Sequence, residues 1–279
     1  MPSHEYPEDT PDHHVGTRDL TRWPTSAGRF LVACVAPLAR TLGPHWAVLL
    51  ILAVGGGIAA ALTALSSEVY EAVMDEDGVA ALDQPALDLA VGLREGWVNT
   101  LVTGYTDLGG PIGMPIIAVS VMVLLAVRRR SWTPVVLMIA AAAGSLLMTV
   151  AGKDLIGRLR PPMELAVPPY ESSPSFPSGH SLNALVIAGI VAYLLVIRQH
   201  RKRAHASTIA LAVVFAVTMG LSRVFLGHHW LTDVLVAWTL GIAWLAVVIT
   251  AHRLFLTFRL HRETVRDDGD AGGGVGATT

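Results

Sequence analysis

The sequence has 279 residues, of which 52% are hydrophobic and only 15% are charged. Its mean hydropathy of +0.52 is too high for an ordinary soluble domain, in which about a quarter of the residues are charged. The formal net charge of -2 excludes the basic excess of nucleic-acid binders, and the single cysteine, Cys34, excludes an internal disulfide and cysteine-ligated zinc. We therefore expect an integral membrane protein.

The two ends of the chain differ from its middle. Residues 1–44 are polar and rich in Pro, His, Asp and Arg, which predicts a mostly disordered tail. The apolar patch in this tail, Phe30 to Leu38, is too short to span a bilayer. Residues 256–279 are predicted to form a second tail, Gly-rich and disordered from Asp267 onwards. One membrane domain, residues 45–255, lies between the tails.

Six apolar runs of spanning length follow one another in this domain. At 1.5 Å per residue, each run approaches the ~30 Å thickness of the hydrocarbon core. All should be helices, because the backbone in lipid must satisfy its own hydrogen bonds and no run alternates like a barrel strand. The predicted spans are residues 47–65, 110–127, 134–151, 181–197, 208–226 and 234–252. The expected fold class is all-α, a polytopic bundle of six transmembrane helices.

Basic residues predict the orientation of this bundle. They follow the second, fourth and sixth runs, at residues 128–130, 198–203 and 253–262. Short loops rich in Lys and Arg stay in the cytoplasm. Both termini should therefore lie on the cytoplasmic side of the plasma (inner) membrane, and three loops on its extracytoplasmic side. The first outer loop, residues 66–109, is acidic and should include an interfacial helix, since its apolar residues recur at near-helical spacing.

The second outer loop breaks the charge pattern, because Lys153, Arg158 and Arg160 lie on the side where cations are otherwise scarce. Contact with lipid headgroups at a helix end is the simplest explanation for each of them. The same loop continues to Pro177-Ser178-Gly179-His180, where a hydroxyl and the free N–H groups of a helix N-terminus favour anion binding. An ordinary helix cap is the alternative for this tetrapeptide.

The third outer loop carries Arg223, His229 and Asp233 between two apolar runs. His229 and Asp233 are four residues apart, so the carboxylate can hold one ring nitrogen and leave the other free as a base or nucleophile. Arg223 adds a planar fork that suits phosphate oxygens.

A metal site is the competing interpretation of these side chains. Its ligands would be His180, His228, His229 and Asp233. It is disfavoured because three nearby cations would repel a divalent ion and attract an anion. These are Lys153, Arg160 and Arg223.

Together these residues resemble the three signatures of the type 2 phosphatidic acid phosphatase superfamily of lipid phosphate phosphatases. Lys153 to Arg160-Pro161 matches the first, Pro177 to His180 the second, and Ser222-Arg223 with His229 and Asp233 the third. No motif position is substituted. The resemblance covers roughly Ala47 to His252 and the six-helix plan, and it omits both tails.

The resemblance implies a role for each matched residue. His229 would attack phosphorus and form a phosphohistidine, Asp233 would orient its ring, and His180 would protonate the departing alkoxide. No metal and no cofactor is implied. The expected phosphate-binding residues are Lys153, Arg160, Ser178, Gly179 and Arg223.

The sequence thus predicts a membrane phosphatase that acts on a lipid phosphate or diphosphate at the extracytoplasmic surface. Candidate substrates are phosphatidic acid, phosphatidylglycerol phosphate and undecaprenyl diphosphate. The alternative is a non-catalytic lipid-phosphate binding or transport protein, but the presence of both His180 and His229 favours catalysis. The preferred lipid and the oligomeric state do not follow from the sequence.

Overall fold

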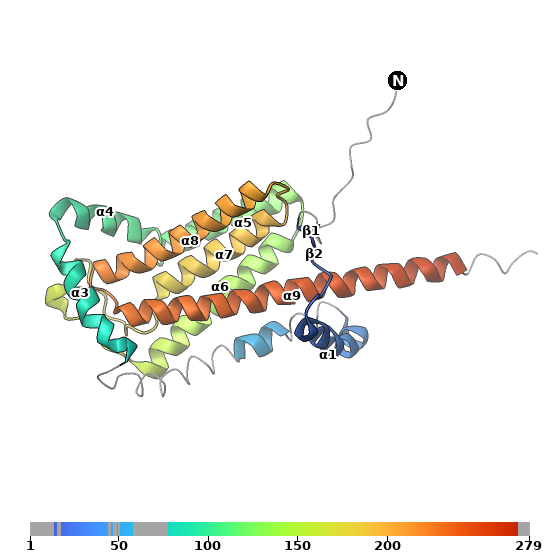
Figure 1. Cartoon of the computed structure of the whole chain (residues 1–279), viewed down its shortest axis with the longest axis horizontal. Helices are drawn as coiled ribbons and strands as arrows, with labels where there is room; N and C mark the ends of the chain where they lie inside the picture. Colours follow the sequence, from blue (N-terminus) through green and yellow to red (C-terminus); the bar gives the residue numbers. More distant parts are fainter. Residues whose placement is uncertain are drawn as a thin grey trace, which may run out of the picture.

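The computed structural model describes residues 14–15, 18–43, 46, 49, 51–57 and 78–272, and it is a helical bundle (Figure 1). The only strands among these residues form a small antiparallel hairpin, β1 (His14–Val15) and β2 (Arg18–Asp19). The helices are α1 (Ser26–Leu42), α3 (Asp83–Gly92), α4 (Gly96–Asp107), α5 (Gly113–Arg129), α6 (Thr133–Ile156), α7 (Gly179–Val196), α8 (Lys202–Phe225) and α9 (Leu231–Gly272), with 3-10 turns η1 (Val79–Leu82) and η2 (Met163–Leu165).

Helix α7 lies at the centre of the bundle and contacts α5, α6, α8 and α9. It is apolar all round, which is typical of a helix surrounded by other helices. Within the described part of the chain, four helices are long and apolar enough to cross a membrane: α6, α7, α8 and the first 29 residues of α9. The expected all-α membrane fold is therefore confirmed, whereas the count of six spans stays a prediction.

The two remaining predicted spans differ from these four. Most of span 47–65 lies outside the described residues. The residues of this span that are described, 49 and 51–57, are helical. Span 110–127 corresponds to α5, an apolar helix of 17 residues. Helix α6 extends five residues beyond its predicted end, so Lys153 lies in the last helical turn rather than in a loop.

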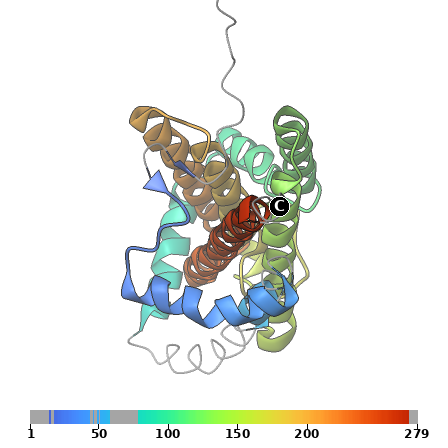
Figure 2. The same ribbon diagram turned by 90° about the vertical axis from the view of Figure 1, so that its right-hand side faces the viewer.

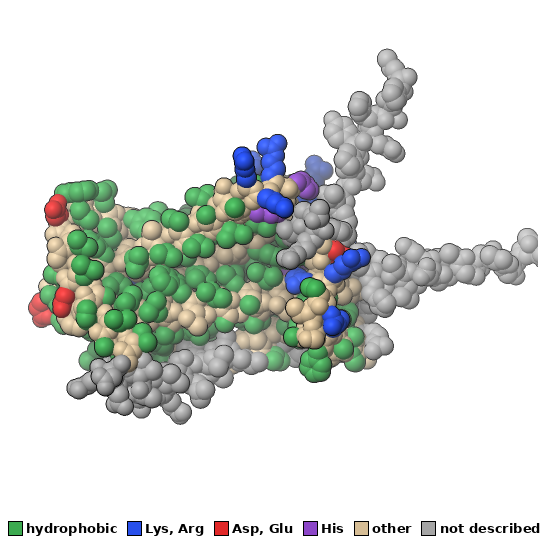
Figure 3. Space-filling view, viewed as in Figure 1, with side chains coloured by type: hydrophobic (Ala, Val, Ile, Leu, Met, Phe, Trp, Pro, Cys, Tyr) green, Lys and Arg blue, Asp and Glu red, His purple; other side chains and the backbone are tan. Residues whose placement is uncertain are grey.

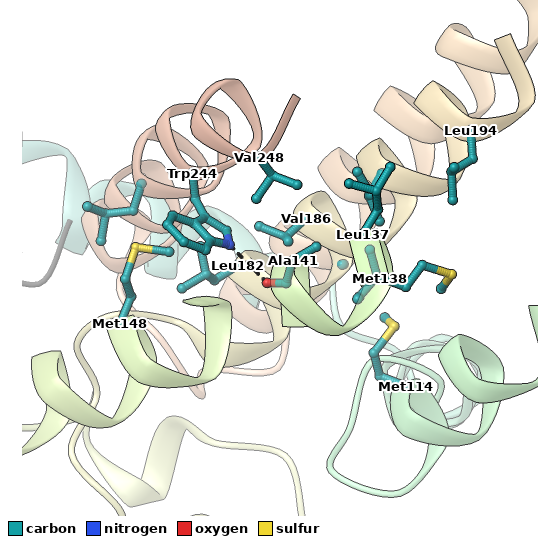
Figure 4. Close-up of a cluster of buried hydrophobic side chains, with 14 of the residues drawn as sticks. Met114, Leu137, Met138, Ala141, Met148, Leu182, Val186, Leu194, Trp244 and Val248 are labelled. Atoms are coloured by element: carbon teal, nitrogen blue, oxygen red, sulfur yellow. Dashed lines mark hydrogen bonds between the residues drawn. The ribbon is translucent and has the colours of Figure 1, made fainter. Parts of the chain in front are cut away.

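The core depends on close approach between α6 and α9 (Figure 4). The indole Nε1 of Trp244 donates a hydrogen bond of 3.1 Å to the carbonyl oxygen of Ala141. Next to it, a Cβ atom on Gly144 would come within 2.0 Å of the Trp244 ring, so only glycine fits there. Leu182 and Val186 of α7 are fully buried in the same cluster. This packing fixes the relative positions of α6, α7 and α9.

The structure corrects the prediction of a mostly disordered N-terminal tail, because residues 26–42 form helix α1. The Thr25 side chain caps this helix by accepting a 3.1 Å hydrogen bond from the Gly28 N–H. Its apolar patch is too short to span but long enough to pack, and Val35 is buried against Leu254 of α9. Figure 2 shows α1 lying across the direction of α9.

Helix α9 continues without a break past residue 255, the predicted end of the membrane domain, to Gly272. The physical reason lies in the sequence: residues 253–266 contain neither Gly nor Pro and are rich in good helix formers. Apolar side chains cover the long sides of the molecule, and basic ones gather towards the end near α1 (Figure 3). Acidic side chains are visible at the opposite end, where α3 and α4 lie (Figures 1 and 3).

Candidate active site

The three polar clusters of the sequence meet at one end of the bundle, where α6 and α8 end and α7 and α9 begin. Lys153 lies in the last turn of α6, His180 in the first turn of α7, and Arg223 in the last turn of α8. His229 lies in the short connection between α8 and α9, and Arg160 in the loop after α6. The structure therefore brings together residues that are up to 80 positions apart.

A tight turn after α8 places His229. Gly227 adopts a left-handed conformation with φ of 71°, and a Cβ there would lie 2.6 Å from the carbonyl oxygen of Leu165. The N–H groups of His228 and His229 then both donate to the carbonyl oxygen of Arg223, at 3.0 and 3.3 Å. The backbone of His229 is thus hydrogen-bonded to Arg223, whose guanidinium is one of the cations of the site.

The His229 ring is held on its Nδ1 side. Nδ1 lies 3.4 Å from Oδ2 of Asp233 and 3.3 Å from the Ser175 hydroxyl, which itself donates to Asp233. Asp233 also accepts a 3.0 Å hydrogen bond from the N–H of Trp230, at the start of α9. With Nδ1 carrying its proton towards Asp233, Nε2 is the unprotonated ring nitrogen, and its lone pair faces the guanidinium of Arg160 at 3.2 Å.

Arg158 holds the second oxygen of Asp233. One terminal nitrogen of Arg158 donates to Oδ1 of Asp233 at 2.6 Å and to the Thr232 hydroxyl at 2.7 Å, and the other donates to Asp83 at 2.7 Å. Asp83 accepts two more hydrogen bonds from Thr232, from its N–H at 2.8 Å and its hydroxyl at 2.7 Å. Helix α3 is thereby tied to the first turn of α9.

Two guanidinium groups share one carboxylate in front of the histidine. Glu171 forms ion pairs with Arg223 and, at 2.7 Å, with Arg160. Arg160 also lies 3.2 Å from Nε2 of His229. The Arg223 side chain is 1% exposed and that of Glu171 29%. The carboxylate therefore offsets part of the positive charge of the two guanidinium groups.

The remaining motif residues lie on the α6 and α7 sides of the site. Lys153 donates from Nζ to the Ser173 hydroxyl at 3.1 Å and to the carbonyl oxygen of Pro174. The Ser178 hydroxyl is buried and caps α7, accepting a 3.4 Å hydrogen bond from the N–H of Ser181. The helix cap considered as the alternative for this tetrapeptide is thus present. A Cβ on Gly179 would lie only 3.1 Å from the Thr149 side chain, so the close approach of Thr149 favours glycine at this position.

The environment shifts the protonation of two groups in the loops. Burial, reinforced by the positive charges of Arg223 and Arg160, lowers the pKa of His229 to about 4 despite the nearby carboxylate of Asp233. For Glu171, burial favours the neutral acid, but Arg223 and Arg160 outweigh it and lower the pKa to about 2. At neutral pH the site thus holds a neutral His229 and an ionised Glu171.

A cavity of about 740 Å³ opens at these residues. Lys153, His180 and His229 contribute to its polar end, together with the loop residues 170–173. Apolar side chains of α5, α6 and α7 line the rest of it: Met114, Pro115, Ala118, Val119, Ala142, Leu146 and Ile187. The cavity therefore has a polar end with charged residues and an apolar end between α5, α6 and α7.

The geometry does not favour the competing metal site. Nε2 of His228 pairs with the carbonyl oxygen of Val167 at 2.7 Å, outside the cavity. Among the residues that the structure describes, no group of three or more His, Cys, Asp or Glu side chains is arranged to hold a metal ion.

Four side chains of this network were not identified from the sequence as parts of the site: Asp83, Arg158, Glu171 and Ser175. Asp83 is one of several acids in the first outer loop, and nothing in its spacing distinguishes it. Glu171 and Ser175 lie in a loop without periodicity, so only the folded chain shows their partners. Arg158 carried a signal, since it is a basic residue on the side where cations are scarce.

Comparison with known proteins identifies relatives. Residues 131–256, which include the three motif clusters, match the family model described as the PAP2 superfamily. Phosphatidylglycerophosphatase B of Bacillus subtilis (strain 168) is 34% identical over 179 residues, which cover 62% of this chain and 85% of that protein. The crystal structure of a transmembrane PAP2-type phosphatidylglycerolphosphate phosphatase from Bacillus subtilis matches with a TM-score of 0.60 and 30% identity, covering 68% of this chain and 93% of that one.

Proposed function

Because the chain belongs to the PAP2 superfamily, we propose that this multi-pass membrane protein hydrolyses a lipid phosphate or diphosphate through a histidine nucleophile. Membership supports a lipid phosphate phosphatase in general terms, and the site supports the finer assignment. The preferred substrate in this proposal is phosphatidylglycerol phosphate, because both relatives are named for that activity. Phosphatidic acid and undecaprenyl diphosphate are the next candidates.

The observation that carries the proposal is the two-part cavity. Its polar end holds Lys153, His180 and His229, and its other end is lined by apolar side chains of α5, α6 and α7. A phosphate with a hydrocarbon tail matches both parts, whereas a soluble phosphate ester would leave the apolar part empty. The tail can remain among the membrane-spanning helices while the headgroup reaches the cations.

In the proposed reaction, Nε2 of His229 attacks phosphorus and the bond from phosphorus to the leaving oxygen breaks. Asp233 holds Nδ1–H and stabilises the positive ring of the phosphohistidine. His180 gives its proton to the leaving alkoxide and then takes one from the water that cleaves the N–P bond. Hydrolysis returns His229 to its neutral form and releases phosphate.

Positive charge would stabilise the transferring phosphoryl group without a metal ion. In this proposal Lys153, Arg160 and Arg223 hold its nonbridging oxygens, together with Ser178 and the N–H of Gly179. Arg160 already lies 3.2 Å from the attacking nitrogen. A guanidinium in contact with both the nucleophile and the phosphoryl oxygens would orient the attack.

We place the site on the extracytoplasmic side of the plasma (inner) membrane, with both termini in the cytoplasm. The positive-inside rule supports this orientation, because basic side chains gather near α1, away from the α3 and α4 end (Figure 3). The non-catalytic alternative is less favoured, because His180 and His229 both line the cavity.

The test is phosphate release by the detergent-purified protein in excess EDTA. Phosphatidylglycerol phosphate, phosphatidic acid and undecaprenyl diphosphate are compared in parallel, with His229→Ala as the negative control. Release that survives EDTA and is lost in the variant supports the metal-independent histidine mechanism, and the relative rates rank the substrates. Equal release by wild type and variant would refute it. Binding of the lipids without release by folded protein would favour the non-catalytic alternative.

A further inference from the structure

A buried trio of charges lies behind the His229 ring, on the side away from the cavity. Arg158 is ion-paired with Asp83 at 2.7 Å and with Asp233 at 2.6 Å, and the three side chains are 7%, 6% and 0% exposed. Ion pairs this deeply buried are not screened by solvent, so their charges act on neighbouring groups. Removing one partner would leave an uncompensated charge.

The charge balance of this trio is specific. The positive phosphohistidine ring is stabilised by the negative charge of Asp233 next to it. Arg158 alone would cancel that negative charge. Asp83 supplies a second negative charge, so the trio carries a net charge of one negative unit. The guanidinium can then orient the carboxylate of Asp233 without removing its electrostatic effect on His229.

We propose that Asp83 and Arg158 are positioning residues for the reaction: Arg158 fixes Asp233 against His229, and Asp83 offsets the charge of Arg158. This inference rests on the proposed role of His229 as the nucleophile. It assigns a function to the first outer loop, since Asp83 begins α3 and also accepts the N–H of Thr232 in the first turn of α9. Asp83 thereby contributes to the electrostatics of the site although it does not itself line the cavity.

Other charges also face His229, and all of them stay unchanged in the test. They are Lys153 of α6, Arg160 and Glu171 in the loop between α6 and α7, His180 of α7, Arg223 of α8 and the neighbouring His228. A difference between variants of the trio therefore reports on the trio itself.

The experiment measures the titration of His229 directly, by NMR of the detergent-solubilised full chain with 13C-labelled histidine, using His229→Gln to assign the signal. Asp83→Asn should move the His229 midpoint to lower pH by about one unit, because the trio becomes neutral. Arg158→Gln should move it to higher pH, because two negative charges remain. The double variant, again with one negative charge, should lie between them. These measurements need no turnover, so they can fail independently of the proposed activity.

Kinetics add the second measurement. Asp83→Asn should lower kcat about tenfold and shift the acid limb of the kcat profile in the same direction as the His229 midpoint. Arg158→Lys keeps the charge and should leave the midpoint near that of the wild type while lowering kcat, which separates charge from geometry. Asp88→Asn is the matched control, since Asp88 lies on the same helix and is exposed.

A purely structural network predicts different results. Midpoints that coincide in the wild type, both single variants and the double variant would overturn the proposal, as would single variants that shift in the same direction. If Asp83→Asn does not fold, the comparison of Arg158→Gln with Arg158→Lys still decides, because only the loss of charge should raise the midpoint.

Discussion

Glu171 occupies the place between Arg160 and Arg223 where the proposed substrate phosphate would bind, so its removal should strengthen anion binding. The shift of its pKa from 4.5 to about 2 corresponds to at most about 3 kcal/mol. Because the side chain is 29% exposed, solvent screening reduces the value to roughly half. About 1.5 kcal/mol is about tenfold in affinity, so Glu171→Gln should bind orthovanadate about tenfold more tightly at pH 7.

The assay is isothermal titration of the purified protein with orthovanadate, which mimics a transferring phosphoryl group and requires no turnover. The matched control is Glu164→Gln, because Glu164 is an exposed acid in the same loop. The unliganded Glu171→Gln protein should also melt at a lower temperature, since the buried Arg223 loses its partner, and vanadate should restore the melting temperature. Unchanged or weaker vanadate binding by Glu171→Gln, with the control equal to wild type, would refute the reasoning.

Further expectations concern pH, the dyad and the core. Activity should have a bell-shaped dependence on pH. The lowered pKa of His229 keeps its ring neutral and active below pH 6.5, so activity should fall only as pH decreases through about 4. A kcat profile that is flat from pH 4 to 9, with chemistry rate-limiting, would contradict the two-histidine scheme. The same lowered pKa predicts that stability, measured by thermal melting, is highest above pH 6.5 and decreases between pH 6.5 and 4 as the unfolded chain binds the proton first; an unchanged pH dependence in His229→Gln would refute this. Ser175→Ala should lower kcat about tenfold with little change in KM, because the Ser175 hydroxyl contacts both Asp233 and Nδ1 of His229; kinetic constants equal to those of the wild type would contradict it. Gly144→Val should destabilise the fold by roughly 3 kcal/mol or prevent its assembly, because a Cβ there overlaps the Trp244 ring. Gly92→Val should melt like wild type, because a Cβ there has no atom of the described residues within 4 Å.

Much of the membrane fold could be predicted from the sequence because its physical signal is strong. An apolar run of about 18 residues in lipid must be helical, so α6, α7, α8 and the first part of α9 follow from hydropathy. Helix ends are weaker signals, since they depend on caps and on helix propensity. This is why Lys153 was expected in a loop and why α9 continues beyond its predicted end.

The candidate site was predictable only where side chains follow one another at fixed spacing. His229 and Asp233 are one helical turn apart, and the turn places them in contact. The ion pairs of the two arginines have no such local spacing. Asp83 is 75 positions from Arg158, and Glu171 is 52 positions from Arg223. Such pairs arise when the helices pack, and no local pattern announces them.

The enclosure of α7 by its neighbours also sets where the chain tolerates change. Ala184 and Ile190 of α7 are fully buried between helices, so an added or lost methyl group there alters the packing beneath His180. Leu211 of α8 is 71% exposed, and any apolar side chain satisfies the lipid at such a position. We expect saturation mutagenesis to divide the bundle accordingly, with an inner helix restricted in size and shape and outer faces restricted only in polarity.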